Sequence, residues 1–424
     1  MKAKKSETLG LAVAYQENQE TAQLAALPLE LWLMRQLLRL LGSPRFGVTF
    51  WDGQHLDPPG SDATIPRLLL NQRRSLWRLF SNTTLHFGDD YSAGDIEIEG
   101  GLVAFLEEFY RAGERIPTGV QQLLDVFGQL RHWRGNPLDR ARDNIYHHYD
   151  IGNEFYRLWL DDEMVYTCAY FAPGAETLEQ AQFAKMEHVC RKLQLKPGQN
   201  VVEAGCGWGA LARHMARHHG VKVRAFNISH EQVAYARARA KAEGLDGQIE
   251  YIEDDYRNIT GEYDAFASVG MLEHVGVKHY AELGAVIDRC LKPHGRGLIH
   301  SIGQNKPCPT SEWTQKRIFP GGYAPALREM LEIFECRNLT VLDVENLRLH
   351  YARTLEHWLE RFERQHDRVR LMYDEAFIRT WRLYLSGSIA NFSTGNLQLF
   401  QVQFARHDDN SVPWSRHDLY PTEE

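Results

Sequence analysis

The chain has 424 residues, of which 43% are hydrophobic and 25% are charged, and its formal net charge is −8. This length favours about two or three domains, and the composition is that of a folded protein rather than a disordered one. A net negative charge argues against nonspecific nucleic-acid binding by the whole chain. The six cysteines are scattered without a CxxC pair, so we expect free thiols in a reducing compartment and no metal site.

The first 120 residues predict a small α+β domain. Residues 22–42 carry an apolar stripe at helical spacing, and residues 46–66 read as short strands separated by Asp-Gly and Pro-Pro turns. A second helix, rich in Leu and Arg, is expected at 67–78, followed by a strand-like turn region and an acidic helix within 87–113. The start of the chain lacks a sustained apolar core, and no window is long enough to span a bilayer, so we expect neither export nor membrane insertion.

Two basic stretches interrupt this otherwise acidic chain. Residues 67–78 carry four Arg and no acidic residue, with Leu and Trp between them, and residues 131–142 carry four Arg against one Asp. Cationic side chains interleaved with apolar ones suit an anionic membrane surface. The same pattern is also typical of an amphipathic core helix with a solvated basic face, and the sequence leaves both interpretations open.

Residues 121–145 form a polar, Arg-rich linker, and a different pattern begins near residue 198. Strands then alternate with helices, and we expect the strands at 200–205, 221–229, 249–255, 263–272 and 295–303. This alternation predicts an α/β fold with a doubly wound, Rossmann-like parallel sheet. The C-terminal third is expected to be mainly helical, including a helix at 327–335, with a last strand at 397–406.

A glycine-rich turn, GCGWG at 205–209, follows the first of these strands and opens a helix. Glycine permits a tight turn and a close approach of the backbone to a ligand. The spacing is not the GxGxxG of a pyrophosphate site, and Asn227 ends the second strand where a ribose-binding acid is expected. With Glu203 before the turn and Asp255 after the third strand, S-adenosylmethionine fits best, because it carries an ammonium, a sulfonium, a ribose and an adenine but no phosphate.

A set of ordered stretches between about residues 144 and 406 completes the pattern: HHYDIGNEFYRLWL, VYTCAYF, GCGWG, NISHEQ, DYRN, SVGMLEHVG, LIHSIG, IFPGG and LQLFQVQFAR. With these stretches the chain resembles the cyclopropane-fatty-acid synthase family of S-adenosylmethionine-dependent methyltransferases. The first 120 residues resemble, more loosely, the smaller domain of bacterial phospholipid-acting members. We therefore expect a small lipid- and membrane-contact domain at 1–120, a linker at 121–145 and the catalytic domain at 146–424.

The resemblance implies transfer of a methylene group from S-adenosylmethionine to a cis double bond in an unsaturated acyl chain of a membrane phospholipid. The alkene would attack the sulfonium methyl, and a base, in the family a bound bicarbonate, would remove a proton from the new methyl so that a cyclopropane ring closes. An alkene needs no metal or nucleophile, only proximity, a water-poor pocket and a proton acceptor. Aromatic side chains could stabilise the cation or serve only as core, and the candidates are Tyr166, Tyr170, Phe171, Trp313, Phe319 and Tyr323.

The resemblance also implies roles for individual residues. The bicarbonate site would comprise Cys168, Glu273, His300, Ile302 and Tyr351. Glu273 would orient the bicarbonate, His300 would donate to it and Ile302 would offer its backbone amide, whereas Cys168 need not be a nucleophile.

With Glu203, S-adenosylmethionine would be held by Tyr166, Thr167, Gly205, Gly207, Gly209, Ser229, Gln232, Asp255 and Tyr256. The family commonly has Ser in place of Thr167 and Thr in place of Asn227, and both substitutions keep a hydrogen-bonding group. His147, His148 and Asp150 belong to the active-site lid motif, where the histidines are expected to be structural.

Three other functions stay open. A family sibling would methylate or methylenate the acyl chain without closing a ring, and a small-molecule C- or N-methyltransferase would share the fold. A non-enzymatic lipid-binding protein would retain it too, although the intact glycine turn and Glu273 speak against that.

The expected partners are unsaturated phospholipids and a membrane surface, with no nucleic acid. We expect a cytoplasmic protein that docks reversibly on the inner membrane face through its basic N-terminal helices. A homodimer is implied by the family resemblance alone.

Overall fold

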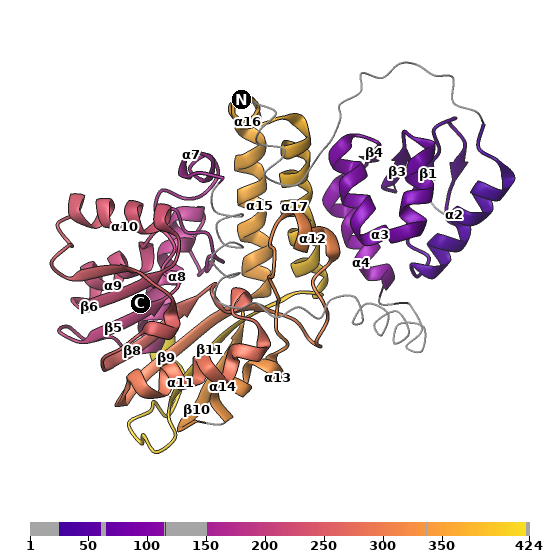
Figure 1. Ribbon diagram of the computed structural model, residues 1–424. Helices are drawn as coiled ribbons and strands as arrows, with labels where there is room; N and C mark the ends of the chain where they lie inside the picture. Colours follow the sequence, from indigo (N-terminus) through magenta and orange to yellow (C-terminus); the bar gives the residue numbers. More distant parts are fainter. Residues whose placement is uncertain (1–24, 61–64, 114, 116–150, 336, 421–424) are drawn as a thin grey trace. The chain divides into compact units, whose positions relative to one another are not determined.

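The computed structural model describes residues 25–60, 65–113, 115, 151–335 and 337–420 (Figure 1). The chain forms two compact units. The first unit comprises Met1–Trp133, Cys308–Pro320 and Leu355–Asn396, and the second comprises Arg134–Pro307, Gly321–Thr354 and Leu397–Glu424. The division therefore differs from the three consecutive blocks expected from the sequence, because helices from the C-terminal third pack with the N-terminal domain. The basic stretch at 131–142 and the lid motif at 147–150 lie outside the described residues.

The first unit contains a four-stranded sheet in the order β2-β1-β3-β4. Its strands are β1 (Gly47–Thr49), β2 (His55–Leu56), β3 (Arg67–Leu70) and β4 (Ile96–Glu99), and its first helices are α2 (Pro28–Leu40), α3 (Arg73–Ala93) and α4 (Leu102–Gly113). Strand β1 runs parallel to β3, and the other pairs are antiparallel. Helix α2 begins with a proline, which lacks an amide hydrogen and so suits the first turn of a helix. Helix α3 ends at Gly94, whose φ of 82° is left-handed and favours glycine.

The prediction of one helix at 67–78 is wrong. Arg67–Leu70 is strand β3, in which Leu68 and Leu70 are buried while their neighbours are partly exposed. The alternating burial is that of a strand in a sheet, and the run of leucines carries no such period in its sequence. The helix begins at Arg73, is kinked at Asn82, where the backbone is not helical, and ends at Ala93, so residues 87–93, expected in a turn region, are also helical.

Four C-terminal elements complete the first unit: α12 (Glu312–Arg317), the part of α15 (Arg348–Arg364) from Leu355 on, α16 (His366–Met372) and α17 (Glu375–Thr394). The Thr380 hydroxyl on α17 lies 2.8 Å from the Ser92 hydroxyl on α3. Trp313 packs so closely on α3 that a Cβ on Gly88 would meet its Nε1 at 2.3 Å. Trp313 and Phe319, two aromatic candidates for the pocket, therefore belong to the hydrophobic cluster of the first unit. No helix among the described residues is long and apolar enough to cross a membrane.

The second unit contains a seven-stranded sheet in the order β10-β11-β9-β8-β5-β6-β7. The strands are β5 (Asn200–Ala204), β6 (Lys222–Asn227), β7 (Ile249–Glu253), β8 (Tyr263–Val269), β9 (Leu291–Gly303), β10 (Leu339–Asn346) and β11 (Gln398–Arg406). Strands β5 to β9 are parallel, whereas β11 is antiparallel to β9 and β10 is antiparallel to β11. The expected Rossmann-like parallel sheet is confirmed. Strand β10 was not expected, and its mostly half-buried side chains at the sheet edge explain its weak apolar pattern.

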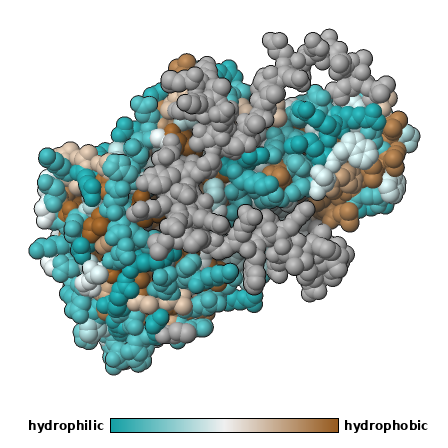
Figure 2. Space-filling model, in the orientation of Figure 1, coloured by the Kyte–Doolittle hydropathy of each residue, from teal (hydrophilic) through white to brown (hydrophobic). Residues whose placement is uncertain are grey.

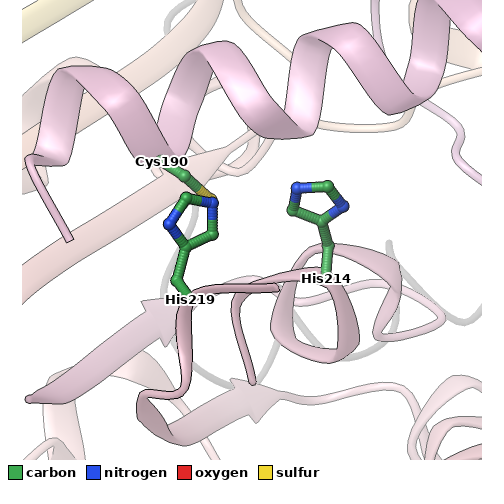
Figure 3. Close-up of side chains that lie close together, drawn as sticks. All are labelled: Cys190, His214 and His219. Carbon is green, nitrogen blue, oxygen red and sulfur yellow. The ribbon is translucent and has the colours of Figure 1, made fainter. Parts of the chain in front are cut away.

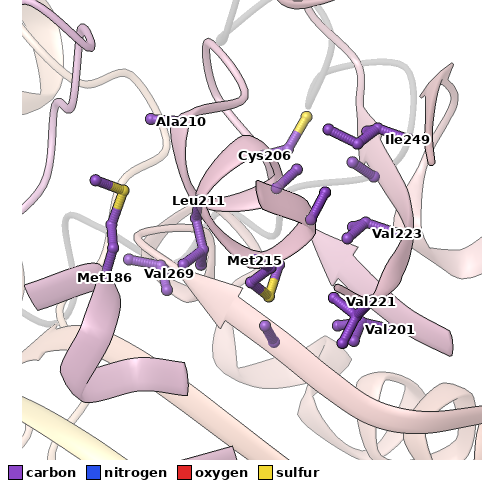
Figure 4. Packing of buried hydrophobic residues seen from close by; sticks show 14 of the residues in the cluster. Met186, Val201, Cys206, Ala210, Leu211, Met215, Val221, Val223, Ile249 and Val269 are labelled. Atoms are coloured by element: carbon purple, nitrogen blue, oxygen red, sulfur yellow. The ribbon is translucent and has the colours of Figure 1, made fainter. Parts of the chain in front are cut away.

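Helices cover both faces of this sheet. One face carries α8 (Leu178–Leu193), α9 (Ala210–His219) and α10 (His230–Ala242), and the other carries α11 (Tyr280–Cys290), α13 (Leu327–Met330) and α14 (Glu332–Glu335). Consecutive valines of β5 separate the two cores, since Val201 packs with the first set of helices and Val202 with the second. Figure 4 shows the first core, in which Leu211 and Met215 of α9 lie over β5. The helix expected at 327–335 is thus two short helices.

The pairing of β9 with β11 leaves no room for a side chain at Gly297. A Cβ there would meet Cζ of Phe404, its cross-strand partner, at 2.0 Å. We expect Gly297→Ala to lower the free energy of unfolding by about 1–3 kcal/mol, because the inserted methyl overpacks a closed core. Urea denaturation followed by circular dichroism measures this change. Gly247→Ala, where a Cβ would meet nothing within 4 Å, is the control, and equal denaturation midpoints for the two variants would contradict the prediction.

Candidate active site

The candidate site lies at the carboxyl ends of β5, β8 and β9. Strand β5 is flanked by β6 on one side and by β8 on the other, so the sheet order reverses there, which is where open α/β sheets bind ligands. A Cβ on Gly205 would meet Cβ of Met271 at 2.8 Å, and one on Gly209 would meet the Tyr251 hydroxyl at 2.5 Å. At Gly207 nothing lies within 4 Å of that position. Two of the glycines are therefore required by packing, and the third faces open space.

Hydrogen bonds to the end of β6 hold the glycine turn in place. The backbone amides of Gly205 and Cys206 donate to the Phe226 carbonyl at 2.9 and 3.0 Å. The Asn227 side-chain amide donates to the Gly207 carbonyl at 3.2 Å and to Gln232 Oε1 at 2.8 Å. Ser229 caps the N-terminus of α10. Asn227 thus braces the turn from the position at which dinucleotide-binding proteins place a ribose-binding acid.

Glu203, two residues before the first glycine, is a buried acid with spare hydrogen-bonding capacity. Burial raises its pKa to about 7, although the positive charges of Lys185 and Arg213 lower it. Its Oε2 atom has no hydrogen-bond partner among the described residues. A cationic group brought by a ligand would supply the missing partner and favour the ionised carboxylate. The ammonium of S-adenosylmethionine is such a group, so the residues present fit this cofactor.

The Tyr166–Cys168 segment lies against the loop after β8. A Cβ on Gly270 would meet Cγ2 of Thr167 at 2.8 Å, and the Thr167 hydroxyl accepts from Nζ of the buried Lys185 at 2.9 Å. Burial lowers the pKa of Lys185 to about 8. Cys168 is fully buried, and burial raises the pKa of its thiol far above the usual range. A neutral thiol is a poor nucleophile, and the burial of Cys168 favours this neutral form.

Two further cofactor candidates, Asp255 and Tyr256, follow β7. Asp255 caps the short helix Tyr256–Asn258, where its Oδ1 accepts from the Arg257 amide at 2.9 Å. Its Oδ2 lies 3.2 Å from the Arg257 guanidinium, and Tyr256 is buried. Both residues therefore stand at the end of the third strand, as expected, with the Asp255 carboxylate already paired to an arginine.

Glu273 and His300 come from adjacent strand ends. Glu273 is half-buried in the short helix Leu272–His274 after β8, where its Oε1 accepts from the Ile302 amide at 2.7 Å and its Oε2 atom is buried. Burial raises its pKa to about 7, opposed by that hydrogen bond. His300 is buried in β9, and its pKa is well below the usual value because of burial and the nearby charges of Lys185 and Lys192. Within the described part of the chain, neither Glu273 Oε2 nor His300 Nε2 has a partner.

The first turns of α15 border the same region. The Thr354 hydroxyl accepts from the Ala169 amide at 3.0 Å, and the Cys168 sulfur lies 4.0 Å from the Leu347 carbonyl. Tyr351 is buried on this part of α15. The structure thus brings the Cys168 and Tyr351 segments together, as it does Glu273 with Ile302.

The remaining aromatic candidates have structural contacts. Tyr166 packs on Tyr156 and Trp159 with ring centroids 5.3 Å apart in each case. Tyr170 stacks between His188 and His350, with Phe171 also stacked on His350, and Tyr323 donates its amide to the Glu273 carbonyl at 2.9 Å.

Sequence reasoning missed two buried lysines on α8. Lys185 and Lys192 are both buried, seven residues apart, and therefore share one helix face. Val189 lies between them on this face. The available signal was that these lysines are in register with an apolar stripe. Lysine is rarely buried without a partner, so such a position indicates a paired lysine.

Comparison with known proteins identifies the family of the chain. The family described as mycolic acid cyclopropane synthetase matches residues 137–402, and a domain of unknown function matches residues 33–118. A "Probable fatty acid methyltransferase" from Pseudomonas putida is 35% identical, with coverage of 88% of this chain and 95% of the relative. The "Cyclopropane-fatty-acyl-phospholipid synthase" of Escherichia coli (strain K12) is 37% identical, with coverage of 80% and 87%.

Solved structures give a matching result. The cyclopropane synthase MmaA2 from Mycobacterium tuberculosis aligns with a TM-score of 0.60 and 27% identity, covering 64% of this chain and 99% of that one. The mycolic acid cyclopropane synthase CmaA1, complexed with SAH and CTAB, aligns with a TM-score of 0.59 and 27% identity, covering 62% and 97%. On the extent of the family match, the strand-end glycine turn and the buried acid before it, the chain belongs to the mycolic acid cyclopropane synthetase family and is an S-adenosylmethionine-dependent methyltransferase.

Proposed function

We propose that this enzyme transfers a methylene group from S-adenosylmethionine to the cis double bond of unsaturated acyl chains in membrane phospholipids, forming a cyclopropane ring. One observation carries the proposal: Glu273 Oε2 and His300 Nε2 are buried polar atoms without partners in the described residues, at the ends of adjacent strands. Buried polar groups are normally hydrogen-bonded. Unpartnered ones at a site of this kind therefore suggest a polar or charged species that arrives during the reaction.

Besides the alkene and S-adenosylmethionine, the reaction needs only one proton acceptor, which takes the proton released on ring closure. The alkene π electrons form a bond to the methyl carbon, the carbon–sulfur bond breaks, and S-adenosylhomocysteine leaves. The resulting cation loses a proton from the new methyl, and the electrons of that carbon–hydrogen bond close the three-membered ring. The protein contributes orientation, exclusion of water and placement of a proton acceptor. The buried, neutral Cys168 suits this scheme, because an ionised thiolate would compete with the alkene for the methyl group.

Bicarbonate, when bound, would supply the base. The residues present fit such an anion: the neutral imidazole of His300 has one ring nitrogen without a partner, and the pKa of Glu273 near 7 leaves a protonated Oε2 available as a donor. Ile302 is the exception, because its amide already donates to Glu273 Oε1. We therefore assign the Ile302 amide the role of holding Glu273, which in turn orients the anion.

The test is incubation of the purified protein with isotopically labelled S-adenosylmethionine and vesicles of unsaturated phospholipid. We expect label in the lipid, a mass gain of one methylene per modified chain, loss of olefinic protons and appearance of ring protons by NMR. A methyl-branched or methylene product would contradict ring closure, and this outcome has a basis in the relatives named as methyltransferases. Labelling of a small molecule but no lipid would contradict the substrate class.

A matched pair of variants belongs to the same experiment. Glu273→Gln keeps the shape of the side chain but removes the titratable group, so we expect kcat to fall by about 10²-fold with calorimetric S-adenosylmethionine affinity unchanged. Glu262→Gln, at an exposed position of the second unit, should keep full activity. A Glu273→Gln enzyme with normal kcat would overturn the proposed role of Glu273.

We also propose that the first unit contacts the membrane, through α2. Leu29, Trp32 and Leu40 are 57%, 52% and 58% exposed and follow one another at helical spacings along α2. Figure 2 shows hydrophobic residues on the surface in the region where Figure 1 places α2. Two arginines of α3, Arg74 and Arg78, keep 66% and 39% of their side chains exposed while they pair with Asp95 and Asp90, each at 2.6 Å. Exposed apolar residues with nearby arginines suit an anionic lipid surface. The homodimer remains an expectation from the family resemblance.

Vesicle binding checks this contact. We expect the wild-type protein to bind vesicles that contain anionic lipid and to bind less as the salt concentration rises. Trp32→Glu should weaken binding by about tenfold, because an inserted apolar side chain contributes roughly 1.5–3 kcal/mol. Trp414→Glu, at a fully exposed tryptophan of the second unit, is the control and should bind normally. Binding that ignores lipid charge and salt, or equal effects of the two substitutions, would contradict the contact.

A further inference from the structure

We propose that Gln401 and Lys192 are positioning residues that hold the His300 imidazole in the tautomer with its proton on Nε2, and so make it a hydrogen-bond donor to the reacting species. This inference rests on the proposed function for the identity of that species. It adds two residues that were not among the predicted site residues, although Gln401 lies within the stretch LQLFQVQFAR.

The β-sheet register brings these groups together. Gln401 of β11 is the direct cross-strand partner of His300 of β9. The side-chain amide of Gln401 lies 3.0 Å from His300 Nδ1, and its Oε1 lies 2.7 Å from Nζ of Lys192. All three side chains are buried. The chain of contacts therefore runs Lys192–Gln401–His300 without access to bulk water.

The donors and acceptors of these hydrogen bonds determine which nitrogen of His300 carries the proton. A lysine ammonium donates and does not accept, so the atom of Gln401 that faces Lys192 is the carbonyl oxygen. The amide NH₂ then faces His300 and can only donate, which requires Nδ1 to be the acceptor. Because His300 is neutral, its single ring proton is on Nε2. This is the nitrogen that has no partner among the described residues.

An ion pair between Lys192 and Glu345 prevents the direction of these hydrogen bonds from reversing. Lys192 also donates to Glu345 at 2.6 Å, and His188 lies 2.8 Å from the same carboxylate oxygen. Burial opposes ionisation of Glu345, but the contacts to His188 and Lys192 outweigh it and lower its pKa to about 2. Burial lowers the pKa of Lys192, and the ionised Glu345 opposes this shift and favours the ammonium that donates to Gln401. The direction of the Gln401 amide is thus set by Glu345, 45 positions after His300 in the chain, acting through Lys192.

Imidazole ¹⁵N NMR of the full-length protein tests the tautomer directly. We expect the wild-type His300 to carry its proton on Nε2. In Gln401→Glu, a carboxylate accepts from both neighbours, so the proton should move to Nδ1 and kcat should fall by about 10²-fold, with KM for S-adenosylmethionine unchanged. Gln401→Met removes both hydrogen bonds at similar size and should give a tautomer mixture and an intermediate kcat.

Two further variants keep the test decisive. Lys192→Met frees the Gln401 amide to rotate and should also give a tautomer mixture. Gln403→Met, on the same strand and hydrogen-bonded to the Lys192 carbonyl, should leave the tautomer unchanged. A wild-type proton on Nδ1, or an unmoved proton in Gln401→Glu, would overturn the assignment. The NMR result does not depend on the lipid product, so failure of the proposed function and failure of this inference are distinguishable.

A separate cluster of metal-binding side chains lies between α8 and α9. Figure 3 shows Cys190 from α8 facing His214 and His219 from α9. Each offers one ligand atom, and the three atoms lie within 4.8 Å of one another. Glu187 completes the group, since its Oε2 is 3.1 Å from Nε2 of both histidines. Two adjacent helices therefore present a thiol, two imidazoles and a carboxylate to one point.

From this donor set we infer a structural Zn²⁺ site. Sulfur and imidazole ligands in a tetrahedral arrangement select zinc. Bonds of about 2.0–2.3 Å place tetrahedral ligand atoms about 3.3–3.8 Å apart, so the three atoms need to close by about 1 Å. Binding would replace the Cys190 thiol proton with the metal and release that proton to solvent. The ion would join α8 to α9 on one face of β5.

Cobalt titration of the chelator-treated full-length protein tests this site. We expect one Co²⁺ per chain, a sulfur-to-cobalt charge-transfer band, tetrahedral visible bands, and displacement by Zn²⁺ with a rise in Tm. Cys190→Ser should abolish the charge-transfer band, and His219→Ala should weaken binding by at least about tenfold. His230→Ala, at an exposed histidine of α10, is the control. Absence of the charge-transfer band in the wild type would show a hydrogen-bonded cluster that binds no metal.

Discussion

Close backbone approach at two glycines holds the candidate site together. Gly205 brings the turn after β5 against Met271, and Gly270 brings the loop after β8 against Thr167, with no room for a Cβ at either contact. The loop that carries Glu273 is thereby held between the cofactor turn and the Cys168 segment. Any larger residue at these glycines would move the cofactor side and the reaction side of the site apart, and both glycines also have positive φ angles that other residues rarely adopt.

Burial determines the chemistry that this geometry permits. In a medium of low polarity an unpaired charge is costly, so Glu203 and Glu273 have pKa values raised to about 7 and His300 is neutral. The charged groups that remain, such as Lys192 and Glu345, are paired with each other. The site thus combines buried groups whose charged forms are disfavoured with an ion pair, Lys192–Glu345, that contacts Gln401.

Local sequence patterns predicted much of the fold and part of the site. Strands β5 to β9 and the glycine turn were predictable because apolar periodicity and glycine conformation are local properties. The strand Arg67–Leu70 was taken for helix because a short Leu-rich run has no clear period, and β10 was missed because an edge strand is half-exposed. In the site, the Ile302–Glu273 and Gln401–His300 contacts could not be predicted. The first contact joins residues 29 positions apart and the second joins residues 101 positions apart, so both depend on strand register and on loop positions.

The discontinuous first unit has a consequence for how the chain is made. Its N-terminal sheet and helices pack against α17, whose last residue is Thr394, and the sheet of the second unit is completed by β11, which ends at Arg406. The ribosome synthesises the chain from its N-terminus. Nearly all of the chain must therefore be synthesised before the core of either unit is complete. Until then, the faces of α3 and α4 that contact α17 in the folded unit are uncovered.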